Sequence, residues 1–290
     1  MKAVDQIRTF NRTVTQQVGA LQGRFLGSSR SLGACRLLFE IGPHGADIRD
    51  LRARLGLDSG YLSRLLRGLE SEGLIDTSPS PRDARARSVT LTPAGGRELS
   101  RLNRRSDAAA RSLLQRLSPA HQQALIAGMG TVERVLLAGA VQLRVEPPTT
   151  RAAAYCLHSY FDELARRFEA GYDPTRGIPA TAADLTPPRG YLVVADLHGK
   201  PVGCGALKVH PRYGEIKRMW VAPSSRGLGI GARILERLEG IARKRQLRLL
   251  RLETNKALTE AQALYRKCGY REVRPFNSEP YAHHWFEKTL

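Results

Sequence analysis

The sequence predicts a two-domain α+β protein, with an N-terminal winged helix-turn-helix unit that includes dimerisation helices and a C-terminal unit built on a mixed α/β sheet. The chain has 290 residues, more than the ~100–200 residues of one typical domain. The paired prolines Pro147-Pro148 interrupt the chain near its middle, because proline cannot continue a helix. Apolar residues before them follow helical spacing, and strand-like runs alternate with helices after them. We therefore expect domains at residues 1–145 and 146–290.

The composition is strongly basic. The chain has 46 Lys and Arg against 27 Asp and Glu, which gives a net charge of +19 and a pI near 10.5. This charge favours a polyanionic partner, such as nucleic acid or a phosphate-rich cofactor, and genomic base composition is the equally simple alternative. No apolar run reaches the ~18 residues of a membrane helix and the N-terminus is not a signal peptide, so we expect a cytoplasmic protein without a membrane partner. The four cysteines are scattered, which predicts neither a disulfide nor a metal site.

The first domain contains a helix-turn-helix pattern. Ile48, Leu51 and Leu55 share one face of a short helix, and residues 56–60 break the pattern. A second helix follows, with leucines at i, i+3, i+4 and i+7 between residues 62 and 69. Its outer face carries groups that can contact phosphates and base edges in a major groove, namely Ser59, Tyr61, Ser63, Arg64 and Arg67.

An arginine-rich wing follows the second helix. The strand-like runs 74–78 and 88–91 flank it, and a hairpin with an arginine-rich tip suits a narrow minor groove. Its candidate DNA contacts are Asp83, Arg85 and Arg87. Thr92-Pro93 then begins another helix, with Thr92 as the N-cap.

The run from Leu74 to Gly95, with its D-A-R-A-R and T-P-A-G segments, resembles the winged-helix regulators of the MarR family. The resemblance covers about residues 1–145. It implies that Arg85 enters the minor groove and that Asp83 orients it, although Ala84 replaces a residue that is commonly basic in relatives. It also implies a homodimer that binds double-stranded DNA, formed by terminal helices whose apolar positions are Val4, Ile7, Val14, Val18, Leu125, Val132, Leu136 and Leu137. The alternatives are a winged helix used for protein contacts and ordinary packing within one chain.

The second domain contains a glycine-rich turn between a strand over residues 214–221 and a helix. Glycines let a backbone approach a phosphate closely, and the free N–H groups at a helix start favour an anion. Arg226-x-x-Gly229-x-Gly231 resembles the R/Q-x-x-G-x-G/A signature of GNAT acetyltransferases, and the run 261–270 resembles their A-x-x-L-Y-x-x-x-G-F/Y motif. The resemblance, over about residues 141–290, implies acetyl-CoA as cofactor. The residues that it implies for the cofactor are Met219, Val221, Arg226, Gly227, Leu228, Gly229, Ile230, Gly231 and Tyr265. Leu258 stands where the family often has an Asn, and Asn255 or Thr259 is the candidate to replace the contact of that Asn with the cofactor.

Amine acetylation needs a base, a polarised thioester carbonyl and an acid. Strict alternation along the strand 214–221 places Glu215, Lys217, Met219 and Val221 on one face. Glu215 is the leading candidate base, Glu253 is a weaker one, and the alternative for Glu215 is an ion pair with Lys217 or Arg212. The GNAT resemblance implies that Tyr265 is the acid and that the Val221 N–H faces the thioester oxygen. Tyr265 could instead only pack against the cofactor.

Candidate contacts for the acceptor are Phe161, Glu163, His283 and His284, with core packing as the alternative. The two adjacent histidines point to opposite faces of a strand, so at most one should enter the site. Together the two resemblances imply a DNA-binding transcriptional regulator that is also an acetyl-CoA-dependent N-acetyltransferase, acting on a small-molecule or peptide amine. Two alternatives remain: a regulator that only senses acetyl-CoA, and an enzyme whose winged helix only dimerises.

Overall fold

The chain forms two compact units in the computed structural model, Met1–Gly128 and Met129–Leu290. The structure describes residues 2–19, 25–80, 83–169 and 171–290, but not the side chains of residues 80 and 83–86. The division lies inside α6 (Pro119–Ala140), earlier than the expected boundary at residues 145 and 146. It lies there because β4 (Gln142–Val145) pairs with a strand of the second unit.

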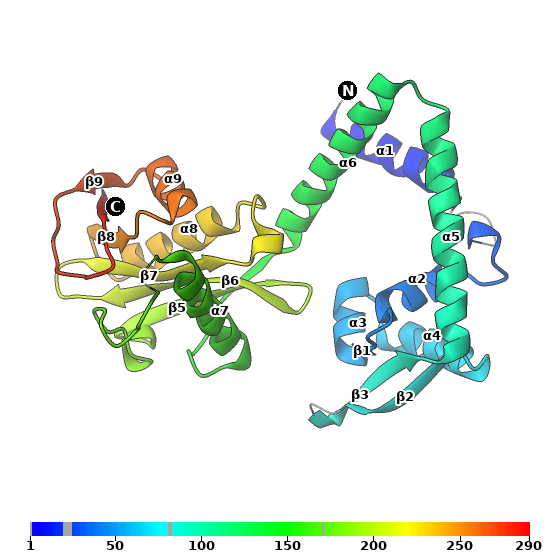
Figure 1. Cartoon of the computed structure of the whole chain (residues 1–290), viewed down its shortest axis with the longest axis horizontal. Helices are drawn as coiled ribbons and strands as arrows, with labels where there is room; N and C mark the ends of the chain where they lie inside the picture. Colours follow the sequence, from blue (N-terminus) through cyan, green and yellow to red (C-terminus); the bar gives the residue numbers. More distant parts are fainter. Residues whose placement is uncertain (1, 20–24, 81–82, 170) are drawn as a thin grey trace. The chain divides into compact units, whose positions relative to one another are not determined.

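The first unit is a winged helix-turn-helix. Its helices pack over a three-stranded antiparallel sheet with the order β1-β3-β2 (Figure 1). A core of buried leucines and isoleucines joins the helices to the sheet. The elements are α1 (Ala3–Gln17), η1 (Phe25–Gly27), α2 (Leu32–Ile41), β1 (Ala46–Asp47), α3 (Ile48–Leu55), α4 (Ser59–Ser71), β2 (Ile75–Ser80), β3 (Asp83–Leu91) and α5 (Pro93–Gln115).

Local signals in the sequence account for the ends of these helices. Asp58 caps α4 by accepting a bond from the Tyr61 N–H at 2.8 Å, and Gly73 follows the helix with φ +65°. Thr92 caps α5 through the Gly95 N–H, which confirms the predicted N-cap. A Cβ on Gly95 would overlap the Leu74 carbonyl, so the glycine of the T-P-A-G segment allows α5 to start directly against the sheet.

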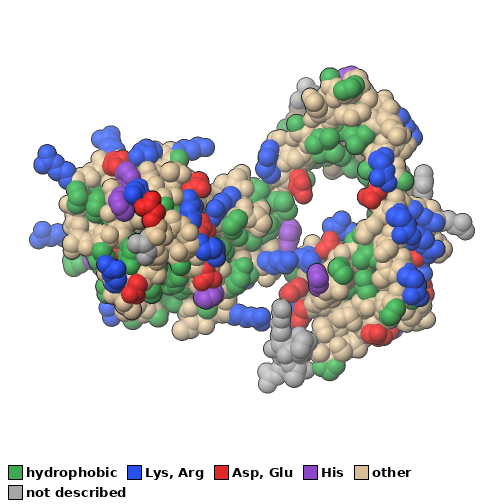
Figure 2. Space-filling model, viewed as in Figure 1, with side chains coloured by type: hydrophobic (Ala, Val, Ile, Leu, Met, Phe, Trp, Pro, Cys, Tyr) green, Lys and Arg blue, Asp and Glu red, His purple; other side chains and the backbone are tan. Residues whose placement is uncertain are grey.

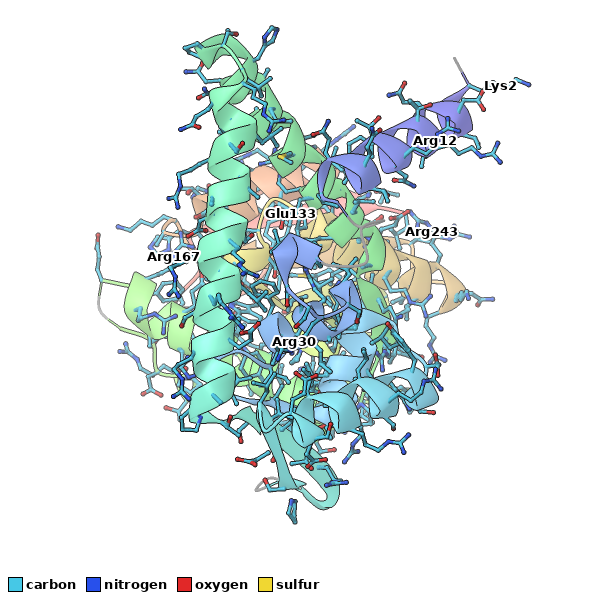
Figure 3. All side chains as sticks on the ribbon, turned by 90° about the vertical axis from the view of Figure 1, so that its right-hand side faces the viewer. Lys2, Arg12, Arg30, Glu133, Arg167 and Arg243 are labelled. Atoms are coloured by element: carbon cyan, nitrogen blue, oxygen red, sulfur yellow. The ribbon has the colours of Figure 1, made fainter. Side chains whose placement is uncertain are left out.

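An arginine ties the first unit together. Arg30 (Figure 3) bonds Glu72 just after α4 and Glu98 on α5, and Glu98 is buried.

Helix α1 has no buried residue, unlike helices α2 to α5. Val4, Ile7 and Val14 are among its exposed apolar side chains.

The second unit is built on a seven-stranded sheet with the order β4-β5-β6-β7-β8-β10-β9. Only the β7–β8 pair is parallel among the described pairs. The strands after β4 are β5 (Gly190–Leu197), β6 (Lys200–Val209), β7 (Gly214–Val221), β8 (Leu249–Thr254), β9 (Arg271–Val273) and β10 (His284–Thr289). The helices are α7 (Arg151–Arg167), α8 (Ile230–Lys244) and α9 (Thr259–Lys267), with short turns η2 (Ala183–Leu185) and η3 (Pro223–Ser225).

Helices α7 and α8 cover opposite faces of this sheet (Figure 1). Alternate residues of β5 show the division, since Val193 packs with α8 and Leu192 packs with α7. Helix α8 packs on the sheet through residues such as Ile234 and Leu235, which are fully buried. In this sheet, α7 and α8 therefore define two separate apolar layers.

The basic residues are distributed over both units. Figure 2 shows Lys and Arg side chains projecting from each of them on the face in view. All four cysteines are free thiols, and three of them are buried. Within the described parts of the chain, no helix has the length and apolar character needed to cross a membrane.

Candidate functional site

The second unit opens between its two central strands. Strands β7 and β8 pair only at their starts, where Gly214 faces Leu250 and Glu215 faces Arg251. Beyond Glu215 the strands diverge, which leaves one edge of β7 without a strand partner. Since the Ala222 N–H donates to Val202 of β6, the neighbouring Val221 N–H points the other way, toward this gap.

A β-bulge in β7 changes which side chains face the gap. Cys204 of β6 faces Trp220 and Ala206 faces Lys217, so β7 carries one extra residue there. Arg218 lies in this bulge with φ +56°. The prediction that Glu215, Lys217, Met219 and Val221 share one face of the strand is therefore wrong. Glu215 and Lys217 lie on the α7 face, whereas Met219 and Val221 pack with the apolar layer under α8.

Glu215 belongs to a buried ionic cluster. Its carboxylate lies 3.1 Å from the Lys217 amine and 2.9 Å from His210 Nε2, and only 4% of the residue is exposed. The ring of Tyr213 stacks on His210 at 4.4 Å. The ion-pair alternative with Lys217 therefore describes the geometry of Glu215, and the residue is absent from the wall of the cavity described next.

A cavity of ≈ 90 Å³ lies in the gap. Glu253 lines it and accepts a bond from the Lys217 amine at 2.7 Å. Burial raises the pKa of the Glu253 carboxyl above its ordinary value. Burial lowers the pKa of Lys217, but the facing carboxylates of Glu253 and Glu215 raise it further, so the amine stays charged. Glu253 is thus a carboxyl group of raised proton affinity at the cavity wall.

Tyr265 also lines the cavity. It begins the last turn of α9, and its ring lies among Tyr270 and Phe286. Burial raises the pKa of its hydroxyl, so the group keeps its proton at neutral pH. The hydroxyl has no hydrogen-bond partner among the described residues.

The glycine-rich turn presents a row of backbone donors. The N–H groups of residues 227–232 have no backbone acceptor in this fully described stretch, and the first bond of α8 is from the Arg233 N–H to the Gly229 carbonyl. Gly227 and Gly229 have φ of +84° and +72°, and a Cβ on either would meet open space. The side chains of Leu228 and Ile230 are buried in the core, so only their backbones face outward. The geometry matches an anion site at a helix start.

Arg226 and Glu163 form a bond that the sequence did not predict. The Arg226 guanidinium lies 2.7 and 2.6 Å from the two Glu163 oxygens, and its Nε donates to the Val221 carbonyl. Trp220 and Arg167 also donate to Glu163. Glu163 is therefore fully bonded within the protein, and the structure places it as a clamp on the glycine turn rather than at the cavity wall.

Three residues predicted to contact the acceptor do not line the cavity, namely Phe161, His283 and His284. His284 bonds Glu272 at 2.6 Å, and exposed His283 is likewise absent from the cavity wall. Phe161 stacks on Tyr172 behind the wall. Asn255 lines the cavity, but its amide donates to the Tyr281 carbonyl and so holds the loop before β10.

Arg218 and Tyr172 are among the residues of the cavity wall that the sequence reasoning missed. Strict alternation places Arg218 on the face opposite Lys217, and only the bulge brings both to the same side. No local pattern indicates Tyr172, which follows α7 and reaches the site by packing on Tyr281. The remaining aromatic wall consists of Tyr160, Phe168 and Tyr281.

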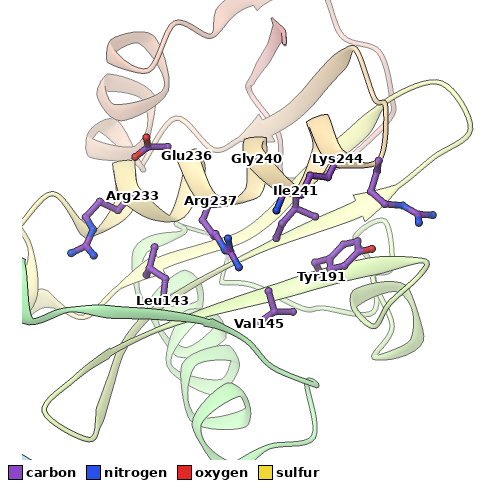
Figure 4. Close-up of a pocket in the computed structure, with 10 residues that line it drawn as sticks. Leu143, Val145, Tyr191, Arg233, Glu236, Arg237, Gly240, Ile241 and Lys244 are labelled. Carbon is purple, nitrogen blue, oxygen red and sulfur yellow. The ribbon is translucent and has the colours of Figure 1, made fainter.

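A second depression of ≈ 540 Å³ lies between α8 and the strands β4 and β5. Figure 4 shows Arg237 and Ile241 projecting from α8 toward Leu143 and Val145. It shares no residue with the β7–β8 cavity. It is therefore a separate surface feature.

In the first unit, the outer face of α4 is exposed. Ser59, Ser63, Arg64 and Arg67 are exposed as predicted, while Leu62, Leu66 and Leu69 are buried beneath them. Tyr61 differs, since its hydroxyl packs against Gly33 of α2 and its ring lies under the Arg64 guanidinium. A half-buried tyrosine at this point stabilises the helix pair and supports Arg64.

The wing forms as the predicted hairpin of β2 and β3. Arg87 is exposed and donates to Thr77 across the hairpin at 2.7 Å. Asp83 and Arg85 lie in β3, but their side chains are outside the described part of the structure. Their roles stay predictions.

Two family models match the chain. The acetyltransferase (GNAT) family model matches residues 157–270, and the MarR family model matches residues 29–86. The first match covers the β7–β8 gap and the glycine turn, and the second covers α2 to β3. Both resemblances found in the sequence are thereby confirmed.

Known relatives resemble the second unit. An IAA acetyltransferase from Azospirillum brasilense is 45% identical over 94 residues, which is 32% of this chain and 61% of the relative. An uncharacterized N-acetyltransferase from Schizosaccharomyces pombe is 35% identical over 99 residues, 32% of this chain and 60% of the relative. The matches thus span about three fifths of these relatives. A putative acyl-CoA N-acyltransferase from Klebsiella pneumoniae is similar over 52% of this chain and 97% of its own, at 26% identity and a TM-score of 0.42. One polypeptide thus carries both an acetyltransferase (GNAT) domain, found over residues 157–270, and a MarR domain, found over residues 29–86.

Proposed function

We propose that this protein is an acetyl-CoA-dependent N-acetyltransferase joined to a dimeric DNA-binding regulator. The observation that supports the enzymatic part most strongly is the β7–β8 gap, which combines an unpaired strand edge with a cavity that contains Glu253 and Tyr265. A protein that only senses the cofactor needs the anion site but not a carboxyl group of raised pKa and a phenol at one cavity.

The free N–H groups of residues 227–232 would hold the pyrophosphate of acetyl-CoA, and the open space at Gly227 and Gly229 fits its close approach. The Arg226–Glu163 pair fixes the turn from which these groups project. When bound, acetyl-CoA supplies the acetyl group as a thioester. The Val221 N–H is oriented to donate to a carbonyl oxygen in the gap.

Proton transfer is assigned to the two groups at the cavity. Glu253 accepts the proton of the acceptor ammonium, since its raised pKa increases its basicity while Lys217 holds the carboxylate in place. Glu215 stabilises Lys217 from behind and positions it. Tyr265 retains its proton and donates it to the departing thiolate.

Calorimetry of acetyl-CoA with two variants of the full chain tests the cofactor site. Gly229→Val places a β-branched residue at φ +72°, which it cannot adopt without strain, so we expect the affinity for acetyl-CoA to fall at least tenfold. Gly240→Val in the middle of α8 is the matched control, because a Cβ there also meets open space but far along the helix from the turn. Equal affinity in both variants and the parent would place the cofactor elsewhere.

For the first unit we propose sequence-specific binding of double-stranded DNA by a homodimer. Support comes from the exposed arginines of α4 and from the unburied apolar residues of α1 and α6, which include Phe10, Ile126 and Leu136. Apolar helix faces of this kind are typical of protein interfaces. Duplex selection from random sequence should recover a site with two half-sites about one helical turn apart. A folded dimer that selects no duplex would contradict this part.

A further inference from the structure

The cavity wall contains a positive charge without a negative partner. Arg218 lines the cavity, and its guanidinium lies 4.7 Å from the ring centroid of Phe161 and 5.6 Å from that of Tyr160. Its main polar interactions are with the hydroxyls of Tyr160 and Tyr172. No carboxylate pairs with it in the described parts of the chain.

The neighbouring hydroxyls do not neutralise this charge. Burial raises the pKa of Tyr160 to about 12, and it raises the pKa of Tyr172 as well, so both phenols are neutral at physiological pH. Arg218 is half-buried, and a partly desolvated guanidinium without an anion is unfavourable, because charges withdrawn from water are normally paired in proteins. The adjacent Lys217 follows this rule, since it bonds both Glu215 and Glu253.

The backbone holds Arg218 in this position. The residue adopts φ +56° in the β7 bulge, a conformation that is unfavourable for a residue with a side chain. Without the extra residue of the bulge, alternation would turn Arg218 away from Lys217 and from the cavity. Such strained positions concentrate at functional sites, because the rest of the fold must enforce them.

We propose that Arg218 binds the carboxylate of the acceptor, so that the acceptor is an amine that also carries a carboxylate, such as a free amino acid. The inference rests on the proposed function, which places the amine of the same molecule at Glu253. The cavity then offers a carboxylate for the ammonium group and a guanidinium for the carboxylate of the acceptor: Glu253 and Arg218 both line it, together with Lys217, Glu279 and aromatic and aliphatic side chains. A bidentate guanidinium is well suited to a carboxylate.

Matched acceptors test this proposal with the full chain. Free L-amino acids and their carboxamides are compared by thiol release from acetyl-CoA, and their binding is measured by calorimetry with coenzyme A present. The acids should bind more tightly than the amides. Arg218→Met should raise the KM and Kd of an acid about 10–150-fold, the range for one charged hydrogen-bonding group, and leave those of its amide nearly unchanged.

The controls separate binding from folding and from the proposed function. Arg166→Met changes an exposed arginine of α7 and should change the KM and Kd of neither the acids nor the amides. Arg218→Lys should retain part of the preference for acids. Acids and amides that bind equally to the parent, or that weaken equally in Arg218→Met, would overturn the role of Arg218. Acetylation of amines without a preference for acids would overturn only this inference, whereas binding of acids without any acetyl transfer would overturn only the proposed reaction.

Discussion

The outer face of α4 and the β7–β8 cavity differ in the exposure and the pairing of their charged side chains. On α4, Arg64 and Arg67 are exposed, and neither forms an ion pair with a described residue. In the cavity, buried Lys217 is bonded to half-buried Glu253. A surface that binds a polyanion needs free cations that release counterions, whereas a site that moves protons needs groups of shifted pKa. The same basic chain thus combines an exposed cationic face with an enclosed ionic cluster, as the proposed binding and reaction sites require.

The largest effect is expected at the desolvated site. Glu253→Gln should lower kcat about 10²–10⁴-fold, the usual contribution of a general base, while acetyl-CoA affinity is retained. The parent's rate should rise as the pH increases through the raised pKa of Glu253, because only the deprotonated carboxylate accepts a proton. Glu253→Gln should lose this dependence. The measurement is a pH–rate profile at saturating acceptor.

Glu215→Gln is the matched control for Glu253, since both carboxylates contact Lys217. We expect a smaller decrease in rate, because Glu215 acts only through Lys217. The rate of Glu215→Gln should still rise with pH as in the parent. A larger loss in Glu215→Gln than in Glu253→Gln would instead make Glu215 the base, which is the assignment predicted from the sequence.

On the exposed face, single changes should have moderate effects. Arg64→Ala should weaken binding to the selected duplex about 10–100-fold, as for one base or phosphate contact. The slope of the logarithm of affinity against the logarithm of salt should become shallower by about 0.9 for each phosphate that the variant no longer neutralises. Arg166→Ala, on α7 of the second unit, should leave both values unchanged. Identical slopes in Arg64→Ala and the parent would exclude a phosphate contact by this residue.

The ionic cluster around Glu163 is intermediate in exposure between the outer face of α4 and the β7–β8 cavity. Glu163 is buried but accepts bonds from partly exposed Arg226 and Arg167. Glu163→Gln should reduce the free energy of unfolding by about 2 kcal/mol, because the charge-assisted bonds from Arg226 and Arg167 are weakened and Arg226 loses its ion-pair partner. Denaturant unfolding measures this value. Glu169→Gln, which changes an almost fully exposed carboxylate just after the same helix, should be nearly neutral.

The smallest effect is expected from Asp184. Bonds from the Thr181 backbone and hydroxyl lower the pKa of Asp184 to about 2. The ionised group therefore stabilises the fold above the ordinary pKa of about 4, and this contribution is lost as the pH falls toward 2. Asp184→Asn should flatten the stability profile over that window by less than about 1 kcal/mol. Parallel profiles for the variant and the parent would contradict the pairing.

The sequence predicted what is local and missed what depends on distant pairing. The bounds of β7 and the cap at Thr92 are confirmed, and so is the exposed face of α4 except for half-buried Tyr61. The β7 bulge depends on the register against β6, so no pattern within β7 indicates it. The bond between Glu163 and Arg226 joins residues 63 positions apart, which no spacing rule predicts. Buried polar sites are therefore harder to predict than exposed ones.

The most direct test of the central claim is thiol release from acetyl-CoA by the full chain, measured with a panel of amines for the parent and Glu253→Gln. We expect at least one amine to be acetylated by the parent, with a rate about 10²–10⁴-fold lower in the variant and an unchanged affinity for acetyl-CoA. Acetyl-CoA binding that alters DNA affinity, without acetylation of any amine, would contradict the claim and identify the second unit as a sensor.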